Sequence, residues 1–155
     1  MLADSSDVDA AICAALSADA ELSALMPGGV WYDVAAPGVD RFVLVSMLTH
    51  EDQRGFGERG FEVFLYLVKA VALGTNGADA KAAAARIDAV LEGAQLTATG
   101  YYWTNCQRVE RIRIKEFDDL SDVTWQHRGG HYEVWVQPIN NAAELKGHDH
   151  ANSRQ

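Results

Sequence analysis

Residues 60–71 read GFEVFLYLVKAV, and this stretch decides the fold. A strand with one face in water carries a polar side chain at every second position. Here polar side chains occur only near the two ends, at Glu62 and Lys69. We therefore interpret the stretch as the central strand of a sheet that is covered on both faces. A layer of helices would cover one face, and the other cover could be a partner subunit.

The length and composition of the chain predict one globular domain followed by a polar tail. The chain has 155 residues, 48% of them hydrophobic, which is enough to build a core without disulfides. Residues 140–155 are polar and show no hydrophobic periodicity. We expect a single domain over residues 1–139 and a tail, residues 140–155, that is disordered or orders only against a partner.

The chain is acidic, and this excludes some classes of function. Its net charge is −9 and its pI is about 4.9, so it has no excess of basic residues with which to bind nucleic acid phosphates or an anionic membrane. Cys13 and Cys106 belong to no redox or zinc motif. The acidic N-terminus is unlike a secretion signal, and no apolar run is long enough to cross a membrane. We expect a protein that folds in a cytoplasm.

Hydrophobic periodicity and turn residues predict an α+β fold. We expect a mostly antiparallel sheet of four to five strands, packed by an N-terminal helix and by one alanine-rich helix between Asn76 and Gly93. Asp19 is a candidate cap for a second, short helix. The expected strands are residues 30–33, 41–48, 60–71, 101–115 and 125–138.

Residues 49–59 (THEDQRGFGER) predict a long, charged loop that makes the connecting hairpin protrude. One interpretation is a solvated, flexible loop. The other is an arm that docks on a neighbouring subunit, with its one aromatic residue as the anchor. The candidate contact residues are Arg54, Phe56, Glu58 and Arg59.

Residues 101–115 (YYWTNCQRVERIRIK) combine a basic stripe with a change of buried face. Val109 is at an odd position whereas Ile112 is at an even one, which predicts a β-bulge. The stripe contains Arg108, Arg111, Arg113 and Lys115. It is either a salt-bridged sheet surface or a charge-complementary subunit contact, since arginine is enriched at interfaces. Residues 116–123, which follow, are expected to form an acidic loop.

The sequence contains no recognised catalytic motif, and we predict no catalytic, cofactor-binding or metal-binding residues. G-x-S-x-G, P-loop, G-x-G-x-x-G and H-E-x-x-H patterns are all absent. His127, His131 and Glu133 form the one cluster with metal-ligand character, and we favour the interpretation that they are ordinary exposed strand residues. A small α+β enzyme or ligand-binding domain that uses these three residues is the distant alternative.

The order of features from residue 8 to residue 138 resembles a known family. The helix, turn, short strand and apolar strand of AALSADAELSALMPGGVWYDVAAPGVDRFVLVSML are followed by the charged hairpin and by GFEVFLYLV. An alanine-rich helix ending in VLEG and a last strand, HYEVWVQ, complete the series. This order is similar to that of the tail-terminator, or tail-completion, proteins of long-tailed bacteriophages and related phage-like particles. The acidic segment 116–123 and the polar tail depart from the pattern.

The resemblance implies a structural role without catalysis. Such proteins form a ring, generally of six subunits, at the head-proximal end of the tail tube. The ring ends tube polymerisation and meets head-completion or neck proteins, and DNA passes through its lumen. It implies a virion protein that is assembled in the host cytoplasm, with the tube protein, a neck protein and further copies of itself as partners. Another neck component, such as a head-completion protein, is the near alternative.

Overall fold

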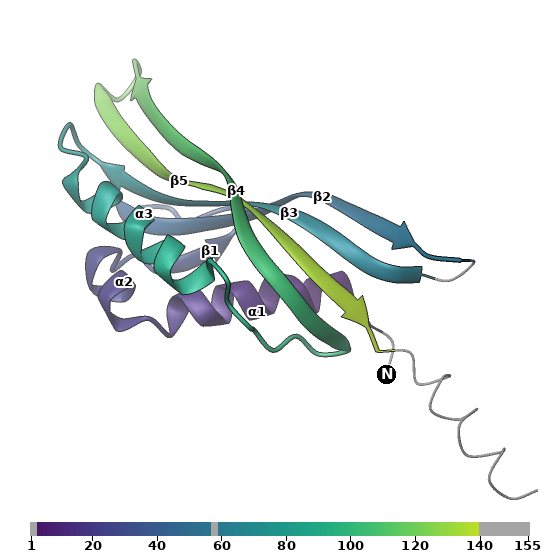
Figure 1. Ribbon diagram of the computed structural model, residues 1–155. Coiled ribbons are helices and arrows are strands. Elements are labelled where there is room, and N and C mark those ends of the chain that lie inside the picture. Colours follow the sequence, from purple (N-terminus) through teal and green to yellow (C-terminus); the bar gives the residue numbers. More distant parts are fainter. Residues whose placement is uncertain (1–2, 57–58, 140–155) are drawn as a thin grey trace, which may run out of the picture.

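The chain folds as an α+β protein in which three helices pack against a five-stranded sheet (Figure 1). The computed structural model describes residues 3–56 and 59–139, without the side chain of Arg59. The predicted tail therefore lies outside the described residues. The elements are α1 (Ser5–Ser17), α2 (Ala20–Leu25), β1 (Val30–Tyr32), β2 (Arg41–Arg54), β3 (Arg59–Leu73), α3 (Ala78–Leu91), β4 (Tyr101–Asp118) and β5 (Val123–Pro138).

The strands lie in the order β1-β2-β3-β5-β4, so the stretch that decides the fold is the central strand, as predicted. β2, β3, β5 and β4 pair antiparallel with their neighbours. β1 is the exception, because it runs parallel to β2, with Trp31 opposite Leu44. Residues 33–40 carry the chain back along the edge of the sheet, so that β2 begins at the same end as β1.

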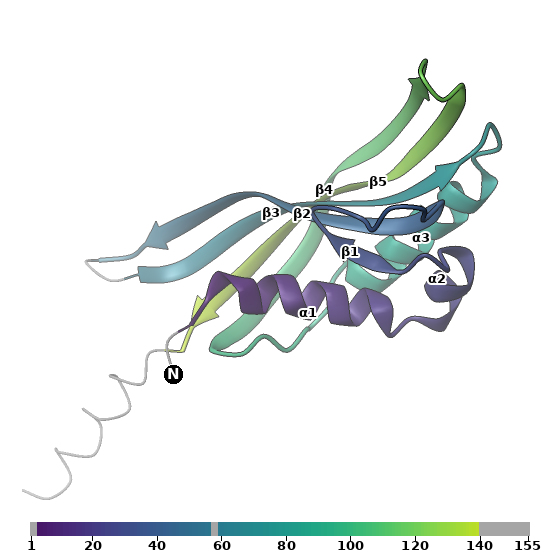
Figure 2. The ribbon, with the colours of Figure 1, turned by 180° about the vertical axis from the view of Figure 1, so that it is seen from behind.

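All three helices cover the same face of the sheet, and the core lies between them (Figure 2). The side chains of Phe64, Tyr66 and Val68 point from β3 into this core and are fully buried. The alanine-rich face of α3 permits its close approach to β3 and β5. No helix in the described part of the chain is both long and apolar enough to span a bilayer.

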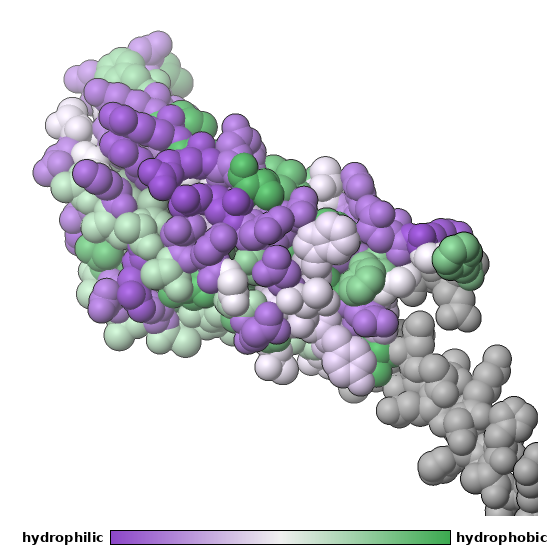
Figure 3. All heavy atoms as spheres, viewed as in Figure 1, coloured by the Kyte–Doolittle hydropathy of each residue, from purple (hydrophilic) through white to green (hydrophobic). Residues whose placement is uncertain are grey.

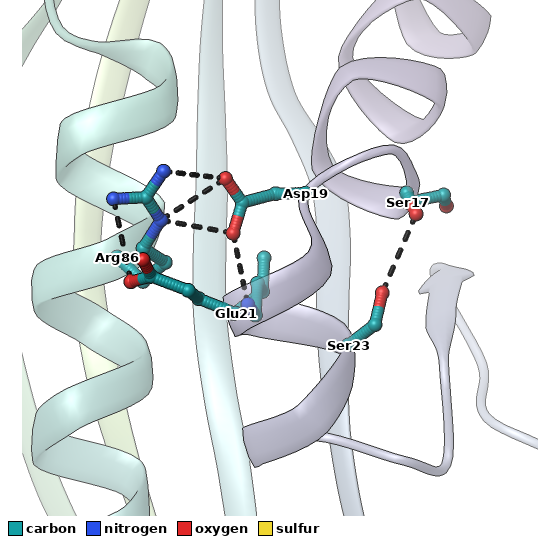
Figure 4. Close-up of polar contacts among 6 residues, drawn as sticks. Ser17, Asp19, Glu21, Ser23 and Arg86 are labelled. Carbon is teal, nitrogen blue, oxygen red and sulfur yellow. Dashed lines mark hydrogen bonds and ion pairs between the residues drawn. The ribbon is translucent and has the colours of Figure 1, made fainter.

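Figure 4 shows how α2 is fixed to α3. Asp19 caps α2 as predicted, and its Oδ1 accepts a hydrogen bond of 2.8 Å from the backbone N–H of Leu22. The same carboxylate accepts hydrogen bonds from Arg86 of α3, with Nη2 2.7 Å from Oδ2 and Nε 2.9 Å from Oδ1. Arg86 therefore joins two helices through one bidentate ion pair.

The predicted loops at residues 49–59 and 116–123 are mostly strand, which corrects both expectations. β2 continues to Arg54 and β3 begins at Arg59, while β4 continues to Asp118 and β5 begins at Val123. The expected protruding hairpin exists as a two-stranded ribbon, and a second long hairpin extends at the β4–β5 end (Figure 1). The strand segments that were missed, residues 49–54 and 116–118, carry no apolar alternation of the kind by which strands are recognised.

The second face of β3 has no cover from the described residues. Val63, Leu65 and Leu67 on that face are only partly buried, and Phe61 is 38% exposed. The predicted double cover is thus present on the helix face and incomplete on the other face. We call this second surface, formed by alternate residues of β2 to β5, the open face.

Candidate functional site

The first candidate surface is the β2–β3 arm, which we define as residues 49–56 with the facing part of β3 from residue 59 to 65. Thr49 pairs with Leu65, and Gln53 pairs with Phe61. Arg54 is exposed, and Phe56 is fully exposed at the end of the arm. Figure 3 shows hydrophobic surface at the end of the arm. Of the other two predicted contact residues, Glu58 and the side chain of Arg59 lie outside the described part.

A polar cluster at the base of the arm was missed from the sequence. Glu62 is 3% exposed, and its Oε2 accepts a hydrogen bond of 2.8 Å from the hydroxyl group of Tyr101. Nε2 of His50 lies 3.2 Å from the same oxygen, and the His50 ring stacks on Phe64 with centroids 4.1 Å apart. These contacts join the arm to the core and to β4.

Ligand atoms of His50, Asp52 and Glu62 all lie within 4.8 Å of one another. One imidazole and two carboxylates at this spacing have the donor set for a divalent cation. The Glu62 oxygen is already engaged by Tyr101, so the cluster also has a purely structural explanation as the hydrogen-bonded base of the arm. The sequence signal was weak, because the three residues meet only when the register of β2 against β3 is known.

The second candidate surface is a hollow between α3 and the strands β4 and β5, with a volume of about 360 Å³. Its cationic side chains surround the single carboxylate of Asp88. We call it the cationic recess, and its charged lining consists of Lys81, Asp88, Arg108, Arg111, Arg113 and Arg128. Figure 3 shows strongly hydrophilic side chains over the upper part of β4, beside the paler surface of α3.

The β-bulge predicted in β4 creates this recess. The register shifts between Arg108 and Glu110, so that Arg108 faces Tyr132 while Arg111 faces Gly130. In a strand with regular alternation, Arg108 and Arg111 are three positions apart and would lie on opposite faces of the sheet. The bulge therefore places Arg108, Arg111 and Arg113 on the helix side, where all three line the recess.

The two interpretations of the basic stripe apply to different arginines. Arg108 is salt-bridged, with Nη1 2.9 Å from Oδ1 of Asp88, and its backbone N–H donates to Oε2 of Glu92 at 2.6 Å. Arg111 and Arg113 make no ion pair with any described carboxylate. Arg108 thus belongs to the structure of the sheet, whereas Arg111 and Arg113 remain available for an outside contact.

The predicted cluster of His127, His131 and Glu133 does not converge on a metal position. Nε2 of His127 lies 3.1 Å from Oε2 of Glu116, and Nδ1 of His131 lies 2.7 Å from Oε2 of Glu110. Glu133 instead accepts a hydrogen bond of 2.7 Å from the indole of Trp135. Burial lowers the pKa of His127, which favours its neutral form. The two histidines therefore contact different carboxylates of the neighbouring strand.

Aromatic pairs lie at both ends of the open face. Phe42 and Trp125 form an edge-to-face pair with centroids 6.3 Å apart, and Phe61 and Trp135 form another at 6.2 Å. Edge-to-face geometry is the preferred arrangement of such rings. The open face is thus an ordered and partly apolar surface, consistent with its predicted contact with a further layer.

Two solved structures contain chains whose fold is similar to that of this protein. A chain from the virion of a native gene transfer agent particle aligns with a TM-score of 0.64 and 24% identity, covering 84% of this chain and 94% of that one. A second solved chain aligns with a TM-score of 0.56 and 12% identity, covering 88% and 96% of the two chains. No protein-family model and no curated protein matches the sequence. At these identities, the likeness establishes a shared fold across almost the whole described domain.

Proposed function

We propose that this chain is a structural component of a phage-like virion, with no enzymatic activity. The observation that carries the proposal is the shared fold with a chain of the gene transfer agent virion, which extends over 94% of that chain. The predicted resemblance to tail-terminator proteins rests on an independent feature, the order of sequence elements.

Within that class, we propose a ring, generally of six copies, at the head-proximal end of a tail tube. It would end tube polymerisation and join the tail to the head or neck, with DNA passing through the lumen without specific binding. A closed ring needs two different surfaces on each subunit, because each copy contacts its two neighbours differently. The β2–β3 arm and the cationic recess are candidate surfaces for contacts with neighbouring copies or with the tube.

The test is the mass of the purified protein alone and in a mixture with isolated tail tubes. We expect discrete oligomers, attachment to tube ends and arrested tube growth. A strictly monomeric protein that never joins a tube would contradict the proposal.

The near alternative, a head-completion or other neck component, makes a different prediction about order of attachment. A terminator binds isolated tails before heads are added, whereas a head-completion protein binds isolated heads. Pull-down of the tagged protein with each purified half of the particle separates these two roles. Binding to heads alone would replace the terminator proposal with the neck alternative.

A further inference from the structure

The cationic recess carries an excess of positive charge, which an anionic group bound there would neutralise. It gathers five cationic side chains around one carboxylate, in a chain whose net charge is −9. That carboxylate, Asp88, is already engaged by Arg108 at 2.9 Å and by the hydroxyl group of Tyr132 at 3.0 Å. Among the described residues, no carboxylate pairs with Lys81, Arg111 or Arg113.

Arg128 adds a second, independent observation. Its Nε is buried, and no described group accepts a hydrogen bond from it. A buried donor without an acceptor costs free energy until an acceptor arrives. An incoming carboxylate at the recess would supply this acceptor and would reduce the repulsion among the clustered cations.

The volume and the lining of the recess indicate what kind of group could bind there. Its volume of about 360 Å³ is that of a pocket for a few side chains. Ala84 and Ala85 of α3 give it an apolar portion beside the cations. The overall charge of −9 repels a long polyanion such as DNA at a distance. A compact turn that presents one apolar side chain between carboxylates fits these properties best.

This chain itself carries such a turn, between β4 and β5. Leu120 is fully exposed there, and it lies between the exposed carboxylates of Asp119 and Asp122. Asp118 holds the turn in shape, because its side chain accepts hydrogen bonds from the backbone N–H of Leu120 at 3.0 Å and from the hydroxyl group of Ser121. A turn that is already ordered loses little conformational freedom on binding.

We propose that the cationic recess of one copy receives the β4–β5 turn of a second copy. Leu120 of the second copy would contact the apolar portion, and its Asp119 and Asp122 would pair with Arg111, Arg113 and Arg128. The two surfaces differ, so the contact is heterologous and can be repeated around a ring. The inference rests on the proposed function, since it names the contact by which the proposed ring would form.

Charge reversal tests the contact directly. We expect Arg111→Glu/Arg113→Glu and Asp119→Lys/Asp122→Lys each to weaken self-association at least tenfold, measured by sedimentation, because each places like charges opposite one another. Combining all four substitutions in one chain should restore association. The matched control for the Asp119→Lys/Asp122→Lys variant is Glu21→Lys/Asp40→Lys, which changes the net charge by the same amount at exposed acids elsewhere and should leave association unchanged. Circular dichroism verifies that each variant is folded.

A disulfide trap locates the contact without reversing any charge. In a Cys13→Ser background, one chain carries Leu120→Cys and a second, mass-tagged chain carries Ala85→Cys. Cys106 is fully buried and can remain. We expect mixed disulfide-linked pairs to dominate over pairs between two Ala85→Cys chains, because the contact joins a turn to a recess.

Three other results would contradict the turn-in-recess contact, and one of them would also contradict the proposed function. If the wild-type protein assembles but neither reversal weakens it, the turn-in-recess contact is wrong and the proposed ring stands. If reversal at the recess abolishes DNA binding and leaves self-association intact, the occupant is nucleic acid and the contact is again wrong. If the wild-type protein neither self-associates nor joins tail tubes, both the contact and the proposed function are wrong.

Discussion

Arg86 of α3 binds the carboxylate of Asp19, the residue that caps α2, through both Nε and Nη2 (Figure 4). One acidic residue therefore ends a helix and holds a second helix in place. Arg86 also lies 3.5 Å from Glu21, at a contact that is mostly exposed and therefore weaker. The hydrogen bonds from Arg86 hold the pKa of Asp19 at about 2, below its ordinary value of 3.8.

This shift predicts how stability depends on pH. The folded pKa is the lower one, so the stabilisation is present above about pH 4 and is lost as the pH falls towards 2. We expect Asp19→Asn, which keeps an acceptor at the cap but removes the charge, to be less stable than wild type at pH 7. The difference should shrink between pH 4 and pH 2 in urea unfolding. A difference that stays constant over this range would show that the ion pair contributes nothing.

Tyr66→Phe is expected to destabilise the fold by about 1.5 kcal/mol, the lower end of the range for a hydrogen bond to a charged group. The hydroxyl group of Tyr66, which is fully buried in β3, donates to Oδ1 of Asp9 in α1 at 2.5 Å. Burial raises the pKa of Tyr66, so the phenol remains a donor at all ordinary pH values. Denaturant unfolding measures the loss. Tyr102→Phe, at a 59% exposed position, is the control and should change stability by less than about 0.5 kcal/mol.

Gly129→Ala is expected to cost about 3 kcal/mol or more, because overpacking against backbone cannot be relieved by a side-chain movement. A Cβ atom at Gly129 would lie 2.0 Å from the carbonyl oxygen of Val68 and 2.6 Å from Cα of Lys69. Gly55→Ala is the control, since no heavy atom lies within 4 Å of its added Cβ. Equal melting temperatures for the two variants would contradict this close approach of β5 to β3.

The β2–β3 arm is predicted to serve assembly and not folding. Phe56→Ser should leave the unfolding free energy within about 0.5 kcal/mol of wild type, because this side chain is fully exposed, yet it should weaken attachment to tubes or neighbours. Val34→Ser, at an apolar position that is 77% exposed and far from the arm in the fold, should affect neither. Deleting residues 53–58 should likewise leave a folded monomer. If the shortened chain fails to fold, the arm is part of the core.

The central strand could be identified from the sequence because its side chains are packed against others, and packing imposes a pattern. Phe64 and Tyr66 show this, since both are fully buried. The outer part of β2, residues 49–54, and the last three residues of β4 could not be recognised. Beyond the helices both sides of a ribbon meet water, and residues such as Glu51 and Glu116 are then as acceptable as apolar ones. The parallel pairing of β1 was also missed, because a three-residue strand carries no signal for its direction.

The candidate surfaces could be predicted from the sequence to different extents. Phe56 could be predicted as exposed because it lies between two glycines in a charged segment. The basic stripe was visible, but its meaning required the position of α3, from which Asp88 neutralises Arg108 and leaves Arg111 free of a described partner. The cluster of His50, Asp52 and Glu62 required the exact pairing of two strands. Local spacing alone cannot supply either relationship.

The bulge at Val109 makes the chemistry of one whole surface depend on a single residue. If β4 kept all its residues but lost the bulge, strict alternation would turn every side chain beyond Val109 to the opposite side. Ile112 and Ile114 would then face α3, and the arginines would join the open face. One bulge therefore decides whether this part of β4 presents arginine or isoleucine side chains to α3, with no change in amino-acid composition.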